Sequence, residues 1–241
     1  MKFDKAKFIH NSNAIEGVET SVKEIEKAVR LKTTKNPHIK NHLKALEYAD
    51  GLAAPLTPLK LLGMHRALSF GILPKKDCGK LREEDVHVAK GGTIVFSPPN
   101  WKKVPVLVKD LIYAVNTKKD PWLCHMEFEY IHPFVDFNGR AGRMLLYWQE
   151  KTQGADPRMI LNEDKDRDYY GKLSEYEKRL RPELWRISIW KKDLTKNQTY
   201  VCVECGTHHA SVVKKCRTCG NANEAKFQIY TEVPSFMGPL I

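Results

Sequence analysis

The chain has 241 residues, of which 42% are hydrophobic and 29% charged, with a formal net charge of +11 at pH 7. This composition is typical of a soluble globular protein and excludes a membrane protein, since no stretch approaches the ~20 apolar residues of a membrane helix. Residues 1–5 lack the apolar core of a signal peptide, so we expect a cytoplasmic protein whose cysteines are reduced or metal-bound. The positive charge favours polyanionic partners: nucleotides, nucleic acid or an acidic protein.

The first predicted element is a short helix over about residues 8–18. Ser12 and Glu16 are four positions apart and so share a helical face, and Gly17 is a plausible C-terminal stop. Taken alone, the segment reads as a capped surface helix. Apolar residues at helical spacing then predict helices over 20–31, 37–52 and 59–69. The third contains His65, which we interpret as a packed or surface residue rather than a catalytic one.

The middle of the chain has a hairpin signal. Two β-prone runs, 86–89 and 93–96, flank the pair at 91–92, which is Gly-Gly. Taken alone, this is a structural hairpin. Pro98 and Pro99 end it, and a helix over 101–116 is expected to follow.

The residues most informative about function are 132–143, HPFVDFNGRAGR. Upstream, Asp120 and Pro121 predict the start of a helix that ends near His132, because the residue before a proline disfavours helical geometry. A second helix is expected from about residues 138–140. The loop between them presents backbone N–H groups at a helix N-terminus, which is a ready anion site.

The same stretch carries side chains suited to phosphate chemistry. Arg140 and Arg143 are three positions apart and emerge on neighbouring parts of one face. Asp136 precedes them, where a carboxylate can hold a divalent ion against phosphate oxygens. His132 is able to accept a proton near neutral pH.

These residues resemble the signature of the Fic family, H-P-F-x-(D/E)-G-N-G-R-x-x-R. The matching positions are His132, Pro133, Phe134, Asp136, Asn138, Gly139, Arg140 and Arg143. Family members mostly transfer AMP from ATP to a Ser, Thr or Tyr hydroxyl of a target protein. The resemblance covers about residues 8–190 and implies a mainly α fold, a Fic-type helical bundle with a β-hairpin flap.

The resemblance also implies a role for each matched position. His132 would be the catalytic base, and Asp136 would bind Mg²⁺. The cofactor, ATP, would be held by Asn138, Gly139, Arg140 and Arg143, the last of these at the γ-phosphate. Phe137 also belongs to this nucleotide-binding loop, but it stands where the family has glycine. If the position requires φ > 0, a bulky aromatic is costly there and changes the anion site or the nucleotide bound.

The resemblance also implies a function for two further segments. Ser12, Glu16 and Gly17 fit the family's inhibitory motif, (S/T)-x-x-x-E-(G/N), in its N-terminal placement. Glu16 would then pair with Arg143 and occupy the position of the γ-phosphate. The hairpin residues Thr93, Ile94, Val95 and Phe96 would form the flap on which the target protein docks by strand addition.

A charged amphipathic helix is expected over about 167–180. Its Tyr169 and Tyr170 either border an adenine pocket or belong to the core. The catalytic domain is expected to span residues 1–194, with a separate module over 195–241. In that module Cys202, Cys205, Cys216 and Cys219 form two C-x₂-C pairs separated by ten residues, the spacing of a zinc ribbon. A module of this size needs a metal to be stable, so Zn²⁺ is the expected ligand.

The sequence therefore predicts a Mg-ATP-dependent protein adenylyltransferase that Glu16 holds inactive. Two alternatives stay open. One is a catalytically weakened nucleic-acid-binding or regulatory protein that acts through the zinc ribbon and through Lys214, Lys215 and Arg217. The other is an enzyme of the same family that transfers UMP or a phosphate. An oligomer is compatible with the sequence, which does not name the target protein.

Overall fold

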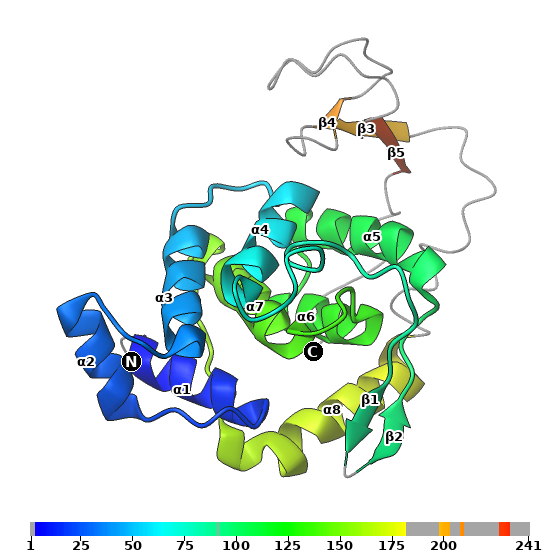
Figure 1. Cartoon of the computed structure of the whole chain (residues 1–241). Coiled ribbons are helices and arrows are strands. Elements are labelled where there is room, and N and C mark those ends of the chain that lie inside the picture. Colours follow the sequence, from blue (N-terminus) through cyan, green and yellow to red (C-terminus); the bar gives the residue numbers. More distant parts are fainter. Residues whose placement is uncertain (1–2, 91, 182–197, 203–207, 210–226, 232–241) are drawn as a thin grey trace.

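A computed structural model of the chain describes residues 3–90, 92–181, 198–202, 208–209 and 227–231. Within them the fold is mainly helical (Figure 1). The α-helices are α1 (Lys5–Ile15), α2 (Val22–Leu31), α3 (Pro37–Asp50), α4 (Pro58–Ser69), α5 (Val104–Asn116), α6 (Pro121–Ile131), α7 (Asn138–Thr152) and α8 (Tyr170–Glu175). The shorter helical segments are η1 (Trp101–Lys103), η2 (Asn162–Asp164), η3 (Lys165–Tyr169) and η4 (Tyr176–Leu180). The mainly helical class is confirmed.

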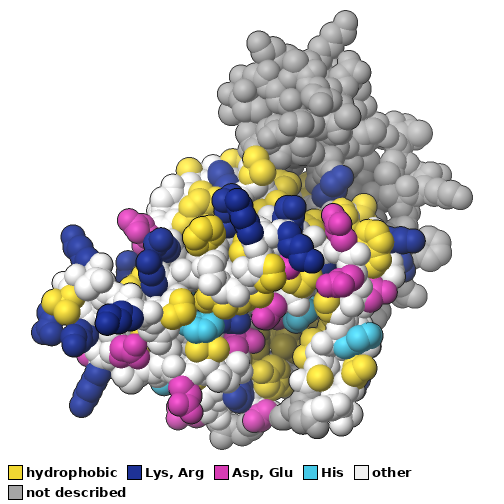
Figure 2. Space-filling view, in the orientation of Figure 1, with side chains coloured by type: hydrophobic (Ala, Val, Ile, Leu, Met, Phe, Trp, Pro, Cys, Tyr) yellow, Lys and Arg dark blue, Asp and Glu magenta, His cyan; other side chains and the backbone are white. Residues whose placement is uncertain are grey.

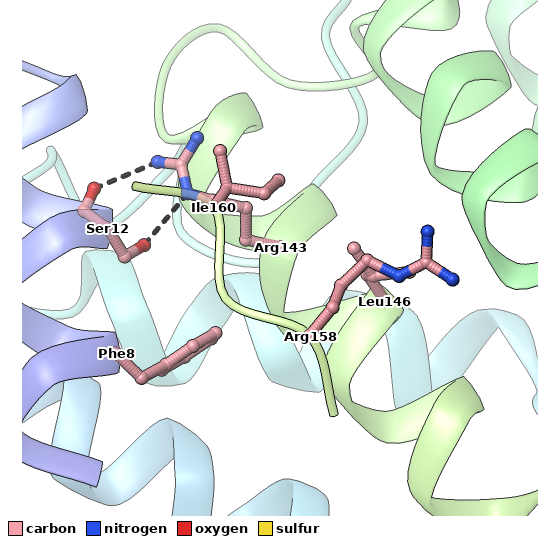
Figure 3. A pocket seen from close by; sticks show the side chains of 6 residues that line it. All are labelled: Phe8, Ser12, Arg143, Leu146, Arg158 and Ile160. Atoms are coloured by element: carbon pink, nitrogen blue, oxygen red, sulfur yellow. Dashed lines mark hydrogen bonds between the residues drawn. The ribbon is translucent and has the colours of Figure 1, made fainter. Parts of the chain in front are cut away.

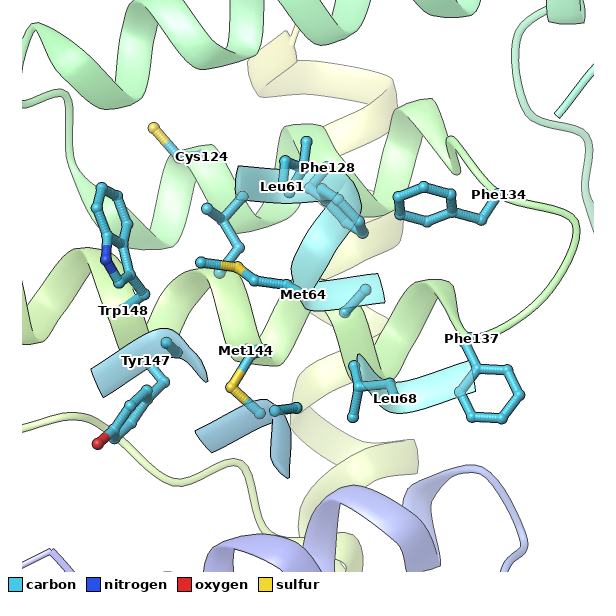
Figure 4. Close-up of a cluster of buried hydrophobic side chains, with 14 of the residues drawn as sticks. Leu61, Met64, Leu68, Cys124, Phe128, Phe134, Phe137, Met144, Tyr147 and Trp148 are labelled. Carbon is cyan, nitrogen blue, oxygen red and sulfur yellow. The ribbon is translucent and has the colours of Figure 1, made fainter. Parts of the chain in front are cut away.

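Helix α7 is the central element of the helical part. It is buried on all sides from Arg140 to Glu150, so neighbouring helices must surround it. It packs against α6, α4, α3 and α1. Figure 4 shows how side chains of α4, α6 and α7 interdigitate, with Phe128 and Met144 among them. The helix that carries the Fic-like motif is therefore rigidly fixed by the core.

The N-terminal helix differs from its expected span of 8–18. It begins at Lys5 because the side chain of Asp4 caps the first turn. It ends at Ile15, and Gly17 follows in the left-handed region with φ +73°. The N–H of Val18 donates to the carbonyl of Asn13 at 3.0 Å, which completes a glycine-terminated C-cap. The stop at Gly17 is confirmed, and Glu16 is the cap residue rather than part of the helical face.

The expected hairpin is confirmed. Strands β1 (Val88–Lys90) and β2 (Thr93–Phe96) pair antiparallel, with Lys90 opposite Thr93. The register shifts between Val88 and Ala89, which marks a bulge near the base of the hairpin. In Figure 1 the hairpin lies beside the segment that contains α8.

The segment expected to be one helix over 167–180 begins earlier and is irregular. It runs through η3, α8 and η4, and both η3 and η4 are π-helical. Its far end is anchored by Glu127 of α6, which accepts a hydrogen bond from the Tyr176 hydroxyl at 2.8 Å and pairs with Arg181 at 2.9 Å. These buried contacts fix the segment against α6.

Three short strands follow in the C-terminal part of the chain. They are β3 (Gln198–Cys202), β4 (His208–His209) and β5 (Phe227–Thr231), and β3 pairs antiparallel with both others. Cys202 is the last residue of β3. The expected domain boundary near 194 and the cysteines Cys205, Cys216 and Cys219 lie outside the described residues, as do Lys214, Lys215 and Arg217. In the described part of the chain, no helix combines the length and hydrophobicity that a bilayer crossing requires.

Candidate active site

The loop between α6 and α7 is shaped by two residues with positive φ. His132 terminates α6 with φ 49°, and Phe137 precedes α7 with φ 64°. The side chain of Asn138 spans the loop: its Oδ1 accepts from the backbone N–H of Phe134, and its Nδ2 donates to the Phe134 carbonyl, both at 2.9 Å. Asn138 was expected to contact phosphate, but its side chain is engaged within the loop. These bonds fix the loop, and the role of Asn138 in phosphate binding stays a prediction.

The imidazole of His132 is held in one tautomer. Its Nδ1 lies 3.2 Å from the backbone carbonyl of Glu129, so Nδ1 must donate and Nε2 carries the lone pair. Burial lowers the pKa of His132 to about 4, against smaller opposing effects of that carbonyl and of Glu16. The ring is therefore neutral at pH 7. Its Nε2 is able to accept a proton from an incoming hydroxyl.

Arg143 is buried and held by the N-terminal segment (Figure 3). Its Nε donates to Ser12 Oγ at 3.0 Å, and its Nη2 donates to the Ser12 carbonyl at 2.9 Å. The same Nη2 pairs with Oε1 of Glu16 at 2.6 Å. The expected contact between Glu16 and Arg143 is thus present in the structure, and Ser12 contributes to it through both its hydroxyl and its backbone.

The carboxylate of Glu16 lies directly over the N-terminus of α7. A Cβ placed on Gly139 would be 2.2 Å from Glu16 Oε1, so only glycine leaves room for this carboxylate. Burial by itself raises the pKa of Glu16, but Arg143, Arg140 and His132 more than offset it, and the pKa is lowered overall. Glu16 is therefore an anion at the place where the helix dipole favours one.

Phe137 is part of the hydrophobic core. Its ring is buried and lies under the guanidinium of Arg140, with 3.5 Å between Arg140 Cζ and the ring centroid. The His38 ring of α3 faces the same phenyl ring, and its Nδ1 accepts from Arg140 Nη1 at 3.2 Å. Phe137 has φ 64°, so the condition that the sequence left open is met. Burial and the cation–π contact offset that backbone cost.

Asp136 is the residue expected to bind Mg²⁺. Its side chain is 60% exposed, with Oδ1 2.5 Å from the backbone N of Phe137 and 3.9 Å from Arg140 Nη2. No group of three or more metal-ligating side chains occurs among the described residues. Mg²⁺ is commonly held by one or two carboxylates together with substrate phosphates. One exposed carboxylate beside an anion site fits that mode of binding.

A cleft of about 690 Å³ opens in front of these residues. Figure 2 shows a recess on this face, where hydrophobic side chains lie among charged ones and histidines. The hairpin contributes Val88, Ala89, Val95 and Phe96; α6 and its end contribute Met126, Glu129, Tyr130 and His132; the N-terminal segment contributes Ile15, Glu16 and Gly17; and α7 contributes Gly139 and Arg143. The remaining wall comes from Lys165, Asp166, Tyr169, Tyr170, Leu173, Ser174 and Glu177.

The structure thus brings part of the expected site into one cavity. Glu16, His132, Gly139 and Arg143 line it, whereas Asp136, Phe137, Asn138 and Arg140 are not among its lining residues.

The two tyrosines border the cleft in different ways. Tyr169 is buried, and its hydroxyl pairs with His125 Nε2 at 2.9 Å, so it belongs to the core as well as to the cleft wall. Tyr170 is partly exposed. On the hairpin, Ile94 and Val95 are 56% and 59% exposed, while the Phe96 ring packs 5.9 Å from that of Tyr130. The flap therefore presents apolar side chains to solvent above the cleft.

Arg82 is a site residue that the sequence argument missed. Its side chain is buried, with Nε donating to the His132 carbonyl at 2.8 Å and Nη2 to the Pro99 carbonyl at 2.5 Å. Its Nη1 donates to the Glu84 carbonyl at 2.9 Å, and its backbone N–H donates to the Pro133 carbonyl at 2.9 Å. Arg82 thus joins the loop between α6 and α7 to both arms of the hairpin. In the sequence, only the position of Arg82 shortly before the predicted hairpin could have indicated this role.

Two buried histidines also support the site. His65 donates from Nε2 to the carbonyl of Asp136 at 3.1 Å and accepts at Nδ1 from the N–H of Gly79 at 2.9 Å. His42 contacts Ser12 Oγ through Nε2 at 3.2 Å. Burial lowers the pKa of His65 to about 4 and that of His42 to about 3, so both are neutral. The expectation that His65 is a packed residue is confirmed, and it supports the loop from behind.

Comparisons with known proteins agree with this geometry. Residues 55–149 match the Fic/DOC family. Over 121 residues the chain is 29% identical to protein adenylyltransferase fic-1 of Caenorhabditis elegans, a match that covers 47% of this chain and 22% of that protein. The chain thus spans about a fifth of the length of this curated relative.

Several solved structures share the fold. A Fic family protein from Desulfovibrio desulfuricans G20 is 26% identical, with a TM-score of 0.61 over 72% of this chain and 57% of that one. A Fic domain containing signaling protein from Bacteroides thetaiotaomicron VPI-5482 is 24% identical, with a TM-score of 0.62 over 71% and 70%. Fic-1 from C. elegans is 21% identical, with a TM-score of 0.58 over 75% and 57%.

Proposed function

We propose that this chain, whose residues 55–149 carry a Fic/DOC-family domain, transfers AMP from Mg-ATP to a Ser, Thr or Tyr hydroxyl of a target protein. The observation that carries the proposal is that His132, at the end of α6, and Arg143, in the second turn of α7, line the same cleft beside the N-terminus of α7. One group is a neutral base and the other a buried cation. Together they provide what phosphoryl-type transfer needs from a protein.

In the proposed reaction, Nε2 of His132 accepts the proton of the target hydroxyl. The hydroxyl oxygen forms a bond to the α-phosphorus of ATP, and the bond from that phosphorus to the bridging oxygen breaks. Pyrophosphate leaves with the electron pair of that bond. The tautomer fixed by the carbonyl of Glu129 keeps the basic nitrogen available for this step.

The nucleotide phosphates would occupy the N-terminus of α7. Backbone N–H groups at Gly139 and Arg140 and the guanidinium of Arg143 are suited to bind the triphosphate. Asp136 would hold Mg²⁺, which neutralises phosphate charge when bound. The aromatic rings of Tyr169 and Tyr170 would border the adenine.

Glu16 would keep the enzyme inactive in its resting state. Its carboxylate already pairs with Arg143 and covers Gly139, so it competes with the terminal phosphate for the same cation and the same space. ATP that binds beside Glu16 would then be in an unproductive position. Release of Glu16 is the step on which activity would depend.

The hairpin would bind the target. Ile94 and Val95 are exposed apolar residues on a two-stranded sheet, and no other strand of the described residues pairs with its outer edges, which suits addition of an extended segment. The target hydroxyl would be presented to the cleft beside Phe96, which lines it.

The test compares wild type, Glu16→Gly and His132→Ala, each incubated with ATP labelled on the α-phosphate and with cell lysate. Glu19→Gly, a change at an exposed acid three residues away, is the matched control. We expect protein labelling to increase in Glu16→Gly, to vanish when His132→Ala is added, and to be unchanged in Glu19→Gly. No label from Glu16→Gly with any nucleotide would exclude the proposed transfer.

The donor nucleotide is a separate question, because Phe137 replaces the family's glycine and holds Arg140 by stacking. An altered loop favours a second candidate, transfer of UMP or of a phosphate. Repeating the labelling with UTP, and with ATP labelled on the γ-phosphate, separates these activities. Label from the γ-phosphate alone would identify a phosphotransferase.

The C-terminal module is proposed to bind Zn²⁺ through Cys202, Cys205, Cys216 and Cys219, because two C-x₂-C pairs provide the tetrahedral thiolate set that zinc prefers. Metal analysis of the purified chain should give one zinc per chain, lost in a Cys216→Ser variant. If this module instead acts on nucleic acid, binding would weaken steeply with salt and upon neutralisation of Lys214, Lys215 and Arg217.

A further inference from the structure

Two glycines on one face of α7 each make room for a carboxyl group. Gly139 and Gly142 are three positions apart and therefore lie on the same side of the helix. A Cβ at Gly139 would be 2.2 Å from Oε1 of Glu16, and a Cβ at Gly142 would be 2.2 Å from Oε1 of Glu129. Both acids line the cleft together with Arg143. The cation that would bind the terminal phosphate thus has two acids near it, from two different elements.

Glu129 differs from Glu16 in its surroundings. Its side chain is 8% exposed, and its Oε1 is buried without a hydrogen-bond partner among the described residues. On the same helix, Nδ1 of His125 is 3.9 Å from Oε1 of Glu129. Nη1 of Arg143 is likewise buried without a partner in the described part of the chain. A charged carboxylate at Glu129 would be poorly compensated, so the neutral acid is favoured.

The charge of Glu129 depends on the anion that occupies the site. Burial raises its pKa to about 8; Arg143 opposes this rise and Glu16 adds to it. When Glu16 leaves, the negative charge that helps to keep Glu129 protonated leaves with it. A phosphate that takes the place of Glu16 would restore that negative charge.

We propose that Glu129 is a further nucleotide-binding residue whose protonated carboxyl group donates a hydrogen bond to the phosphate held by Arg143. Nucleotide binding to the chain without Glu16 is then accompanied by uptake of a proton. This inference rests on the proposed function, since it requires that a nucleotide phosphate occupies the cleft. A neutral acid in this place is a donor, whereas an ionised one would repel the phosphate.

The charged groups that act on Glu129 are Arg143 and Glu16, and His125, His132, Tyr169 and Tyr170 line or border the same part of the cleft. Lys165, Asp166 and Glu177 also line the cleft. Burial lowers the pKa of His125 to about 3 and that of His132 to about 4. Burial raises the pKa of Tyr169 and of Tyr170 above that of a free tyrosine. Arg143 keeps its charge, because Glu16 and the other acids near it raise its pKa against the effect of burial, and the pKa of Glu16 is lowered. A proton taken up near pH 8 is therefore assigned to Glu129.

The test is calorimetry of Mg-ATP binding to Glu16→Gly at pH 8, in two buffers that differ in ionisation enthalpy. The difference in observed enthalpy gives the number of protons taken up. At this pH the nucleotide phosphates are fully ionised before binding. We expect uptake of up to one proton and an affinity that falls up to ten-fold per pH unit above pH 8.

Three variants in the Glu16→Gly background complete the test. Glu129→Gln keeps a neutral donor, so nucleotide should still bind, with proton uptake abolished and affinity independent of pH near 8. Glu129→Leu removes the donor and should weaken binding roughly ten-fold. Glu177→Gln alters another acid that lines the same cleft, and proton uptake should be unchanged.

The outcomes separate this inference from the proposed function. Binding with the same proton uptake in Glu129→Gln would overturn the role of Glu129 and leave the proposed function intact. Equal affinities of Glu129→Gln and Glu129→Leu would exclude a hydrogen bond to phosphate. Absence of nucleotide binding in Glu16→Gly and in all three variants would reject the proposed function itself.

Discussion

The carboxylate of Glu16 meets the guanidinium of Arg143 at 2.6 Å, although the two residues are 127 positions apart in the chain. The Arg143 side chain is almost fully buried, whereas that of Glu16 is 29% exposed. An ion pair with one accessible partner is able to open without unfolding the core. This accessibility is consistent with the inhibitory role proposed for Glu16.

Ser12 should contribute to the inhibition proposed for Glu16, because it also binds Arg143. In Ser12→Ala, Arg143 loses the hydroxyl that accepts from its Nε but keeps the Ser12 carbonyl and Glu16. One hydrogen bond to a charged group contributes roughly 1.5–3 kcal/mol, so inhibition should be partly relieved. We expect a labelling rate between those of wild type and Glu16→Gly. Addition of Ser12→Ala to Glu16→Gly should give no further increase, and a rate equal to wild type in the single variant would show that Ser12 is dispensable.

The stability of the fold should depend on pH through four buried histidines. Burial lowers the pKa of His42 and of His125 to about 3, and that of His65 and of His132 to about 4. Between pH 4 and 6.5 the unfolded chain binds these protons and the folded chain does not, so stability falls as pH falls through 6.5.

Each histidine should contribute a slope that approaches about 1.4 kcal/mol per pH unit in urea unfolding between pH 5 and 6.5. Glu129, whose pKa is raised to about 8, should offset one of these contributions, because in this range the folded chain holds its proton and the unfolded chain does not. In a His65→Asn variant, the dependence of the free energy of unfolding on pH should be smaller by the contribution of one histidine, about 1.4 kcal/mol per pH unit. A free energy of unfolding that does not change across this range would contradict the assignment of four neutral buried rings.

Arg82 should position both the catalytic loop and the hairpin. In Arg82→Lys the carbonyls of His132 and Pro99 lose a fixed donor, and a buried charge is left poorly paired. Loss of such a network typically costs about 3–5 kcal/mol. We expect a lower free energy of unfolding and a lower kcat in the Glu16→Gly background, with Mg-ATP affinity retained.

The control for this variant is Arg30→Lys, a change at an exposed arginine of α2. A second comparison is Asp85→Asn, because Asp85 binds the N–H of Trp101 and joins the hairpin arms without touching His132. Asp85→Asn should raise the KM for the target more than it lowers kcat. If Arg82→Lys lowered Mg-ATP affinity as much as it lowers kcat, Arg82 would have a general structural role.

At Phe137, substitution by glycine should destabilise the fold less than substitution by alanine. Removal of a buried phenyl ring costs about 3–5 kcal/mol, and the cation–π contact with Arg140 is lost as well. At φ 64°, however, glycine relieves backbone strain of roughly 1–2 kcal/mol that alanine retains. Phe137→Gly should therefore be less destabilised than Phe137→Ala in urea unfolding. Greater stability of the alanine variant would show that strain at this position is negligible.

The exposed flap residues should act on the target and not on the fold. Ile94→Lys and Val95→Lys place a charge on side chains that are already in solvent, so the free energy of unfolding should change by less than about 0.5 kcal/mol. Labelling of the target should fall in both variants in the Glu16→Gly background, with Mg-ATP affinity unchanged in Ile94→Lys, because Ile94 does not line the cleft and Val95 does. A matched change on another exposed apolar residue, Leu59→Lys, should leave labelling unaffected.

The sequence by itself determined the local structure. Asp120 caps α6, Gly17 ends the N-terminal helix, and the glycine-containing turn separates β1 from β2, because caps, turns and positive φ depend on neighbouring residues. The resemblance at residues 132–143 also predicted phosphate chemistry, and that at Ser12, Glu16 and Gly17 predicted the pairing of Glu16 with Arg143.

Only the tertiary structure decided how distant side chains share the site. The burial of Phe137 under Arg140, the carbonyl contacts of Arg82 and the neutral acid at Glu129 arise from packing between elements far apart in the chain. No local pattern specifies such contacts, since they depend on which helix faces meet around α7. Helix patterns located the loop between α6 and α7 in the chain. The enclosure of that loop by neighbouring elements determines which of its groups are charged, neutral or accessible.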